Sequence, residues 1–173
     1  MNGHWDTAKL LIEGGADVNQ WDLYGQSPLY MAVDIKTVES GGRIELPTYD
    51  VTTPQDIVKR LLEKGANPNL QLKLRPPFRN VPQDRLADPM LTTGATPLLR
   101  AAKAGDVDSV RLLLEHGAIV DLPNVFGLTP LMAAAGSGRG NVPTRGRSKT
   151  EAQALETIRL LRAAGANPNV RSV

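Results

Sequence analysis

Hydrophobic residues recur at helical spacing in four short segments of the chain. Within each segment the apolar side chains stand three or four positions apart, which places them on one face of a helix. These apolar positions are Ala8, Leu11 and Ile12; Ile57, Val58, Leu61 and Leu62; Val107, Val110, Leu113 and Leu114; and Leu155, Ile158 and Leu161. The pattern therefore predicts four amphipathic helices.

All four segments end in the same way. A Gly-Ala pair follows each apolar stripe, and an Asn or Asp stands four residues after the glycine. The four glycines are Gly15, Gly65, Gly117 and Gly165. Because glycine adopts the left-handed conformation at little cost, we predict that each helix closes there.

Three further segments carry a helix start signal. Each has a hydroxyl residue, then Pro and Leu: Ser27-Pro28-Leu29, Thr96-Pro97-Leu98 and Thr129-Pro130-Leu131. The hydroxyl group caps the first free amides, and proline suits the first helical turn. Alanines follow each signal, so these three helices can approach their neighbours closely. The repeated unit is a short helix, a longer helix and an extended loop with a turn.

This unit resembles the ankyrin repeat, which has a period of about 33 residues and a Thr-Pro-Leu-His-x-Ala signature. The resemblance covers nearly the whole chain and implies a single all-α domain at 1–173. Its helix-turn-helix units would stack into a solenoid with hairpin-like fingers. The expected divisions are a partial repeat at 1–21, a repeat at 22–69 with an insertion near 34–52, a hairpin insertion at 70–90, a repeat at 91–121, and a repeat at 122–173 with an insertion near 136–149.

The chain departs from the ankyrin pattern in three respects. The signature His is replaced by Tyr30, Leu99 and Met132. Arg162 stands where the other units carry an apolar residue. The first unit lacks its short helix and no polar unit closes the other end, so we expect a segment of a longer array that self-associates through its uncapped terminal repeats. The inserted loops are similar to those of some bacterial ankyrin proteins.

The composition of the chain excludes several kinds of functional site. The chain is 41% hydrophobic, has 20 Lys and Arg against 18 Asp and Glu, and contains two His and no Cys. These counts exclude disulfides, thiolate metal sites and multi-histidine sites. The Gly-rich stretch at 136–140 lacks the Gly-Lys-Ser/Thr ending of a phosphate loop, and Ser27 and Thr129 are explained as helix caps. We therefore expect no catalytic residue, no cofactor and no metal.

The resemblance implies that fingertips and short helices line a concave surface that binds a protein partner. The side chains expected there are Trp21, Leu23, Tyr24, Gln26, Thr92, Thr93, Lys103, Val125, Phe126 and Leu128. Three of the seven aromatic residues are in this set, and exposed aromatic clusters are enriched in binding hot spots. The same aromatics could instead pack finger against finger or beneath an insertion.

Two alternatives to a protein-binding scaffold remain. An acid-free basic stretch contains Arg139, Arg145, Arg147 and Lys149 and could bind an anion or nucleic acid, although a solvated loop explains it as well. The chain could also be a structural spacer in a larger protein. The near-neutral charge balance makes nucleic acid the less favoured partner, and no membrane partner is expected. Without an apolar signal segment, the cytoplasm is the default location.

Overall fold

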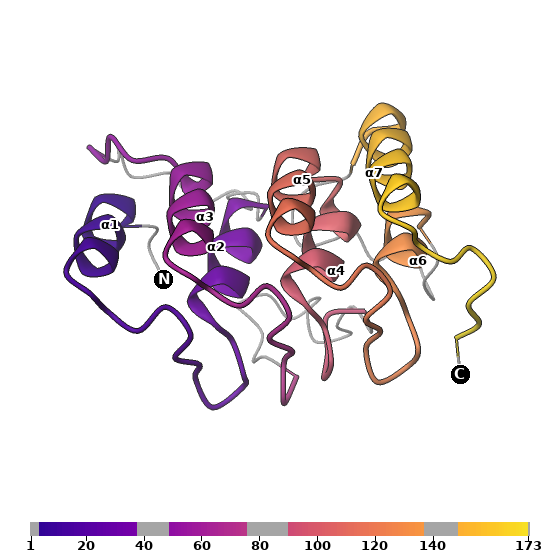
Figure 1. Ribbon diagram of the computed structural model, residues 1–173, viewed down its shortest axis with the longest axis horizontal. Coiled ribbons are helices and arrows are strands. Elements are labelled where there is room, and N and C mark those ends of the chain that lie inside the picture. The colour runs from indigo at the N-terminus through magenta and orange to yellow at the C-terminus, as the bar shows by residue number, and fades with distance from the viewer. Residues whose placement is uncertain (1–3, 38–48, 76–89, 137–148, 173) are drawn as a thin grey trace, which may run out of the picture.

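The computed structural model describes residues 4–37, 49–75, 90–136 and 149–172, and this part of the chain contains helices and no strands (Figure 1). The helices are α1 (Trp5–Glu13), α2 (Pro28–Lys36), α3 (Pro54–Glu63), α4 (Pro97–Ala104), α5 (Val107–Glu115), α6 (Pro130–Ala134) and α7 (Glu151–Ala163). The predicted all-α solenoid is confirmed. None of these helices is long and apolar enough to cross a membrane.

The helices form four units stacked side by side. Unit 1 is α1 alone, unit 2 is α2 and α3, unit 3 is α4 and α5, and unit 4 is α6 and α7. Helices α1, α3, α5 and α7 stand in one row, and α2, α4 and α6 stand in the row beside it (Figure 1). The loops that lead from one unit to the next all project on the same side, and we call them fingers.

The predicted start and stop signals act as expected. Ser27, Thr96 and Thr129 each accept a hydrogen bond from the backbone N–H three residues later, with proline in the first turn. Thr53 and Thr150 cap α3 and α7 in capping boxes. The four closing glycines have φ values between 82° and 93°, which confirms their left-handed conformation.

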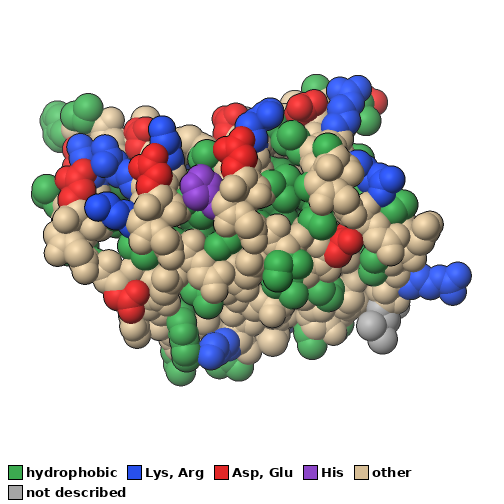
Figure 2. All heavy atoms as spheres, in the orientation of Figure 1, with side chains coloured by type: hydrophobic (Ala, Val, Ile, Leu, Met, Phe, Trp, Pro, Cys, Tyr) green, Lys and Arg blue, Asp and Glu red, His purple; other side chains and the backbone are tan. Residues whose placement is uncertain are grey.

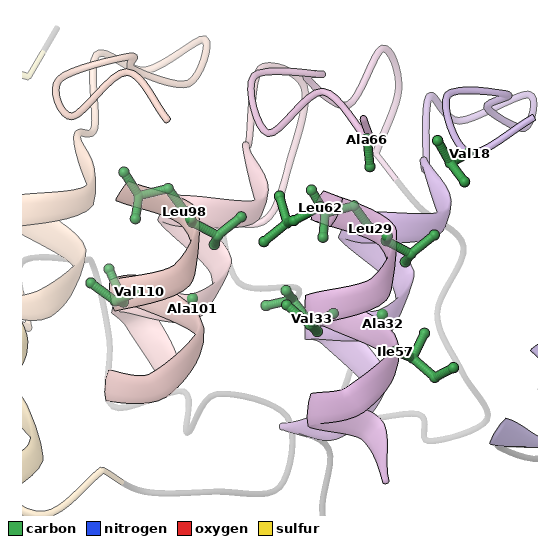
Figure 3. Packing of buried hydrophobic residues seen from close by; sticks show 14 of the residues in the cluster. Val18, Leu29, Ala32, Val33, Ile57, Leu62, Ala66, Leu98, Ala101 and Val110 are labelled. Atoms are coloured by element: carbon green, nitrogen blue, oxygen red, sulfur yellow. The ribbon is translucent and has the colours of Figure 1, made fainter. Parts of the chain in front are cut away.

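The core lies between the two rows and continues through all units. Figure 3 shows the part of it that lies in units 2 and 3. Small residues occupy its centre: Ala101, Ala102 and Ala134 are fully buried in α4 and α6, so the helices of the other row pack closely against them. A second apolar cluster lies between the fingers and the row of α2, α4 and α6, and it contains Tyr30, Met31, Leu72, Met90, Ala95, Leu99 and Ala133. Tyr30 and Leu99, which replace the signature His, are therefore core residues.

The middle finger connects α3 to α4 and contains the expected insertion. Its hydrogen bonds show where in the chain the additional residues are inserted. Leu72 N–H donates to the Ala95 carbonyl, and Gly94 N–H donates to the Leu72 carbonyl. In the other two fingers, the backbone of Asp22 and that of Asn124 make the same two hydrogen bonds within a tight turn. The additional residues are therefore inserted in the chain between Leu72 and Gly94. In the segment expected as an insertion near 34–52, residues 34–36 still belong to helix α2.

Side-chain amides connect consecutive units at one repeated position. Asn19 donates from Nδ2 to the Gly65 carbonyl (3.1 Å) and accepts from the Asn67 N–H (2.7 Å). Asn69 makes the equivalent bonds to Gly117 (3.0 Å) and Ile119 (2.8 Å) in the next unit. Asp121 stands at the third such position, where it accepts from the Asn167 N–H at 2.9 Å.

The two ends of the stack differ in polarity. Arg162 is exposed on α7, and its guanidinium donates to the Ala166 carbonyl. On α1, Leu10 and Leu11 are 69% and 60% exposed, although the residues equivalent to Leu11 are buried in every other unit. Asp50 Oδ2 accepts a hydrogen bond from the backbone N–H of Trp5 at 2.7 Å, which attaches α1 to unit 2.

The packing predicts which leucines support the fold. Leu113 is fully buried in α5, whereas Leu23 is 75% exposed on a finger. We expect Leu113→Ala to lower the free energy of unfolding by about 2 to 5 kcal/mol, because it leaves a cavity in the core. Leu23→Ala is the control and should change it by less than about 0.5 kcal/mol. Urea unfolding of both variants checks this, and equal losses would contradict the assigned core.

Candidate protein-interaction surface

The fingertips are rigid because a single side chain organises each tight turn. Asp22 Oδ1 accepts hydrogen bonds from the N–H groups of Tyr24 and Gln26, both at 2.9 Å. Asn124 Oδ1 does the same for Phe126 (2.9 Å) and Leu128 (3.1 Å). Neither Asp22 nor Asn124 was among the predicted contact residues. Their signal is an Asp or Asn three residues before a turn glycine, the arrangement of an Asx turn.

Neighbouring fingers are joined through their backbones. Lys73 N–H donates to the Tyr24 carbonyl (2.9 Å), and Val125 N–H donates to the Thr93 carbonyl (3.0 Å). A Cβ atom at Gly25 would lie 2.5 Å from the Lys73 nitrogen, so only glycine permits this approach. The described residues on either side of the middle insertion therefore lie between the tips of the first and third fingers. The fingers therefore form one continuous surface.

Four of the predicted contact residues are exposed apolar side chains on this surface. Leu23 is 75% exposed, Val125 58%, Phe126 47% and Trp21 43%. The Lys73 ammonium lies 3.7 Å from the centroid of the Trp21 ring, a cation–π contact that fixes the ring. Figure 2 shows hydrophobic and basic side chains along the lower edge of the molecule, where the fingers project. We call the side chains of Trp21, Leu23, Val125 and Phe126 the fingertip patch.

The other predicted finger residues are less accessible. Thr92 is buried, which leaves little of its side chain accessible for the predicted contact. Tyr24, Gln26, Thr93 and Leu128 are half-buried. Gln26 donates from Nε2 to Asp22 Oδ2 (2.7 Å), and Leu128 packs against the second cluster. These four side chains mainly support the fingers.

Two lysines meet where unit 3 contacts unit 4. Burial and the nearby Lys149 ammonium lower the pKa of Lys103 to about 8, and burial also lowers the pKa of Lys149. Lys149 Nζ donates to the Ala133 carbonyl at 2.6 Å, near the end of α6. The remaining residues of the predicted basic loop, Arg139, Arg145 and Arg147, lie outside the described residues.

Two ion pairs connect unit 2 to unit 3 beneath this surface. Arg100 Nε donates to Asp34 Oδ1 (2.6 Å), and both side chains are almost completely buried. Lys36 Nζ contacts Asp106 Oδ1 (2.7 Å) and also donates to Gln55 Oε1. The two η nitrogens of Arg100 are buried without a partner. No sequence pattern indicated this network, because its members come from helices far apart in the chain.

The side chains of His116 and Asp106 make structural contacts at the two ends of α5. His116 Nδ1 lies 2.8 Å from the Leu112 carbonyl at the end of α5, and Asp106 caps the start of the same helix. In the part of the chain that the structure describes, no three His, Cys, Asp or Glu side chains gather as metal ligands do.

The pair of lysines predicts a pH dependence of stability. Because the pKa of Lys103 is lower in the folded chain than in the unfolded chain, the unfolded state binds more protons between about pH 8 and 10.5. We therefore expect the free energy of unfolding of the wild type to rise over this range relative to Lys103→Gln. Urea midpoints at pH 7.5, 8.5 and 9.5 measure it, with Lys59→Gln on the exposed face of α3 as control. If the free energies of unfolding of the wild type and Lys103→Gln change with pH in parallel, the pKa of Lys103 is not lowered in the folded chain, which would contradict the prediction.

Comparison with known proteins identifies the repeat. A profile described as "Ankyrin repeats (3 copies)" matches residues 51–172, and one described as "Ankyrin repeat" matches residues 1–23 and 24–73. Human "Ankyrin repeat and MYND domain-containing protein 1" is 43% identical over 81 residues, 45% of this chain. Human "Neurogenic locus notch homolog protein 1" is 29% identical over 137 residues, 75% of this chain. The chain spans 6% and 5% of these two proteins. The chain belongs to the ankyrin-repeat family.

Proposed function

We propose that the chain is a non-catalytic scaffold that binds a protein partner through the fingers and the adjoining faces of α2, α4 and α6. The observation that carries this proposal is the fingertip patch, four apolar side chains held exposed on rigid, hydrogen-bonded turns. Exposed apolar groups that gather on one surface mark interaction sites. Stacked repeats commonly use such an extended surface for binding.

Within the patch, Trp21 and Phe126 are the proposed anchors. Aromatic side chains contribute a large contact area and lose few rotatable bonds on binding, which is why they are enriched among hot spots. Leu23 and Val125 extend the apolar contact on either side. Lys103 is the proposed polar contact at the unit 4 end of the surface. Its lowered pKa makes it responsive to a nearby anionic group of the partner.

Self-association through α1 is a second candidate. Its support is the exposure of Leu10 and Leu11, two neighbouring leucines on one short helix. Anion binding through the basic loop has less support, because the Lys149 ammonium already donates to the Ala133 carbonyl. A structural spacer would have no partner at the fingertip patch, whereas a scaffold would bind one there.

A double variant, Trp21→Ala with Phe126→Ala, tests the proposed interface. Each truncation should cost more than about 1 kcal/mol of binding to a partner, since both side chains are anchors. The matched control is Tyr49→Ala, which removes an aromatic side chain that is 94% exposed and outside the fingers. Partners captured from a cell extract by each protein are compared by quantitative mass spectrometry, with melting temperature as the measure of folding.

The scaffold predicts unchanged melting and a specific loss of captured partners in the double variant, with Tyr49→Ala like the wild type. Equal capture by all three proteins would contradict the interface. A large drop in melting temperature with capture retained would assign both aromatic side chains to the fold.

A further inference from the structure

The charges at the described tips of the fingers are mainly positive. In the segments 20–26, 70–75, 90–95 and 122–128, which form these tips, the charged residues are Asp22, Lys73 and Arg75. The Asp22 carboxylate accepts three hydrogen bonds from within its own finger, two from backbone N–H groups and one from the Gln26 side chain. These donors offset its negative charge. Lys73 and Arg75 are both exposed, so the tips present positive charge to a partner.

Both the backbone and the side chain of Lys73 are held in place. Its N–H donates to the Tyr24 carbonyl (2.9 Å), and its ammonium lies 3.7 Å from the centroid of the Trp21 ring. The ring contacts one face of the ammonium, which has three N–H groups, so donors remain for an oxygen acceptor of a partner. A carboxylate bound there would also lie at the edge of the fingertip patch, because Trp21 belongs to that patch.

Apolar side chains lie close to this cation. Leu74 follows Lys73 and is 50% exposed, and its N–H donates to the same Tyr24 carbonyl (3.2 Å). Leu23, which precedes Tyr24, is 75% exposed. The segment 122–128 of the third finger contains no charged residue, so its part of the patch is purely apolar. The surface therefore combines apolar contacts at both ends with a cation beside the first finger.

We propose that the segment of the partner that binds the fingers is an acidic, apolar peptide. Its aromatic or aliphatic side chains pack on the fingertip patch, and an Asp or Glu carboxylate accepts a hydrogen bond from the Lys73 ammonium. This partner chemistry rests on the proposed scaffold function. Complementary charge steers association and disfavours wrong partners, so a basic segment is rejected at the same surface.

An anionic membrane also attracts apolar and basic groups, but it fits these tips less well. Polybasic segments that bind such membranes contain about four to eight Lys and Arg. The described tip segments contain two, Lys73 and Arg75. The Lys73 ammonium also lies on the Trp21 ring, so insertion of the ring among lipid chains would bury a charge, which is costly.

Selection of random linear peptides displayed on phage, with the whole chain as bait, tests this proposal. The peptides that are kept bind the wild type and lose binding to the double variant Trp21→Ala, Phe126→Ala. Relative to the unselected library, they should be enriched in Asp and Glu beside aromatic and aliphatic residues. Melting temperatures of wild type and variant show that both are folded.

A selected peptide is then synthesised in two forms, with Glu and with Gln at its acidic positions. Lys73→Gln should weaken binding of the acidic form about fivefold more than binding of the Gln form, the effect of an exposed ion pair. The matched control is Lys59→Gln, which removes an exposed positive charge from α3 and should bind both peptides as the wild type does. Equal losses of both peptides in Lys73→Gln would overturn the assigned contact.

The outcomes separate this proposal from the scaffold function. Peptides that depend on both aromatic residues but carry no excess of Asp and Glu would overturn the acidic partner and leave the scaffold in place. If no peptide depends on the two aromatic residues, both proposals fail. Binding of the wild type, but not of the double variant, to vesicles of phosphatidylserine and phosphatidylcholine would also overturn the acidic partner, because the patch would then contact a membrane.

Discussion

No unit of this chain can bury its apolar stripe alone, so the fold depends on the contact between units. The junction of units 2 and 3 shows this dependence most clearly. Val33, Leu98 and Ala101 are buried between helices of both units, and the Asp34–Arg100 pair lies in the same region without access to water. A charged pair in that position is tolerated only while both partners remain. Stability in such a stack is thus a sum of unit and junction terms.

The interaction surface follows from the same stacking. Each unit presents its finger on the same side, and the backbone bonds between fingers hold the tips at fixed separations. Gly25 and Gly94 permit this closeness, because a Cβ atom at either position would collide with the next finger. The apolar side chains of the fingertip patch consequently stay exposed without collapsing onto one another. Rigid display of this kind reduces the ordering cost of binding.

Local signals in the sequence predicted most of the fold. Capping residues such as Thr150 and closing glycines such as Gly165 act within a few residues of their own position, so their roles can be read from spacing. The position of Phe126 at a fingertip was predicted for the same reason, because it precedes a turn glycine. The burial of Thr92 depends on how the middle finger folds back, which spacing alone does not indicate.

Contacts between distant segments could not be predicted. Asp34 and Arg100 are 66 residues apart, and each alone has the appearance of a solvated helix residue. Their pairing follows from the stacking of α2 on α4, which fixes which faces meet. Asp121 is a similar case: in the sequence it matches Asn19 and Asn69 as a polar loop residue. Only the geometry of the junction shows that its Oδ1 is buried without a hydrogen-bond partner.

A double-mutant cycle on Asp34 and Arg100 tests most directly whether the stack depends on this junction. Asp34→Leu and Arg100→Met are made singly and together, and their urea unfolding is compared with that of the wild type. The account predicts that each single variant loses about 3 to 5 kcal/mol, because it leaves a buried charge without its partner, whereas the double variant loses much less. Additive losses in the double variant would contradict it.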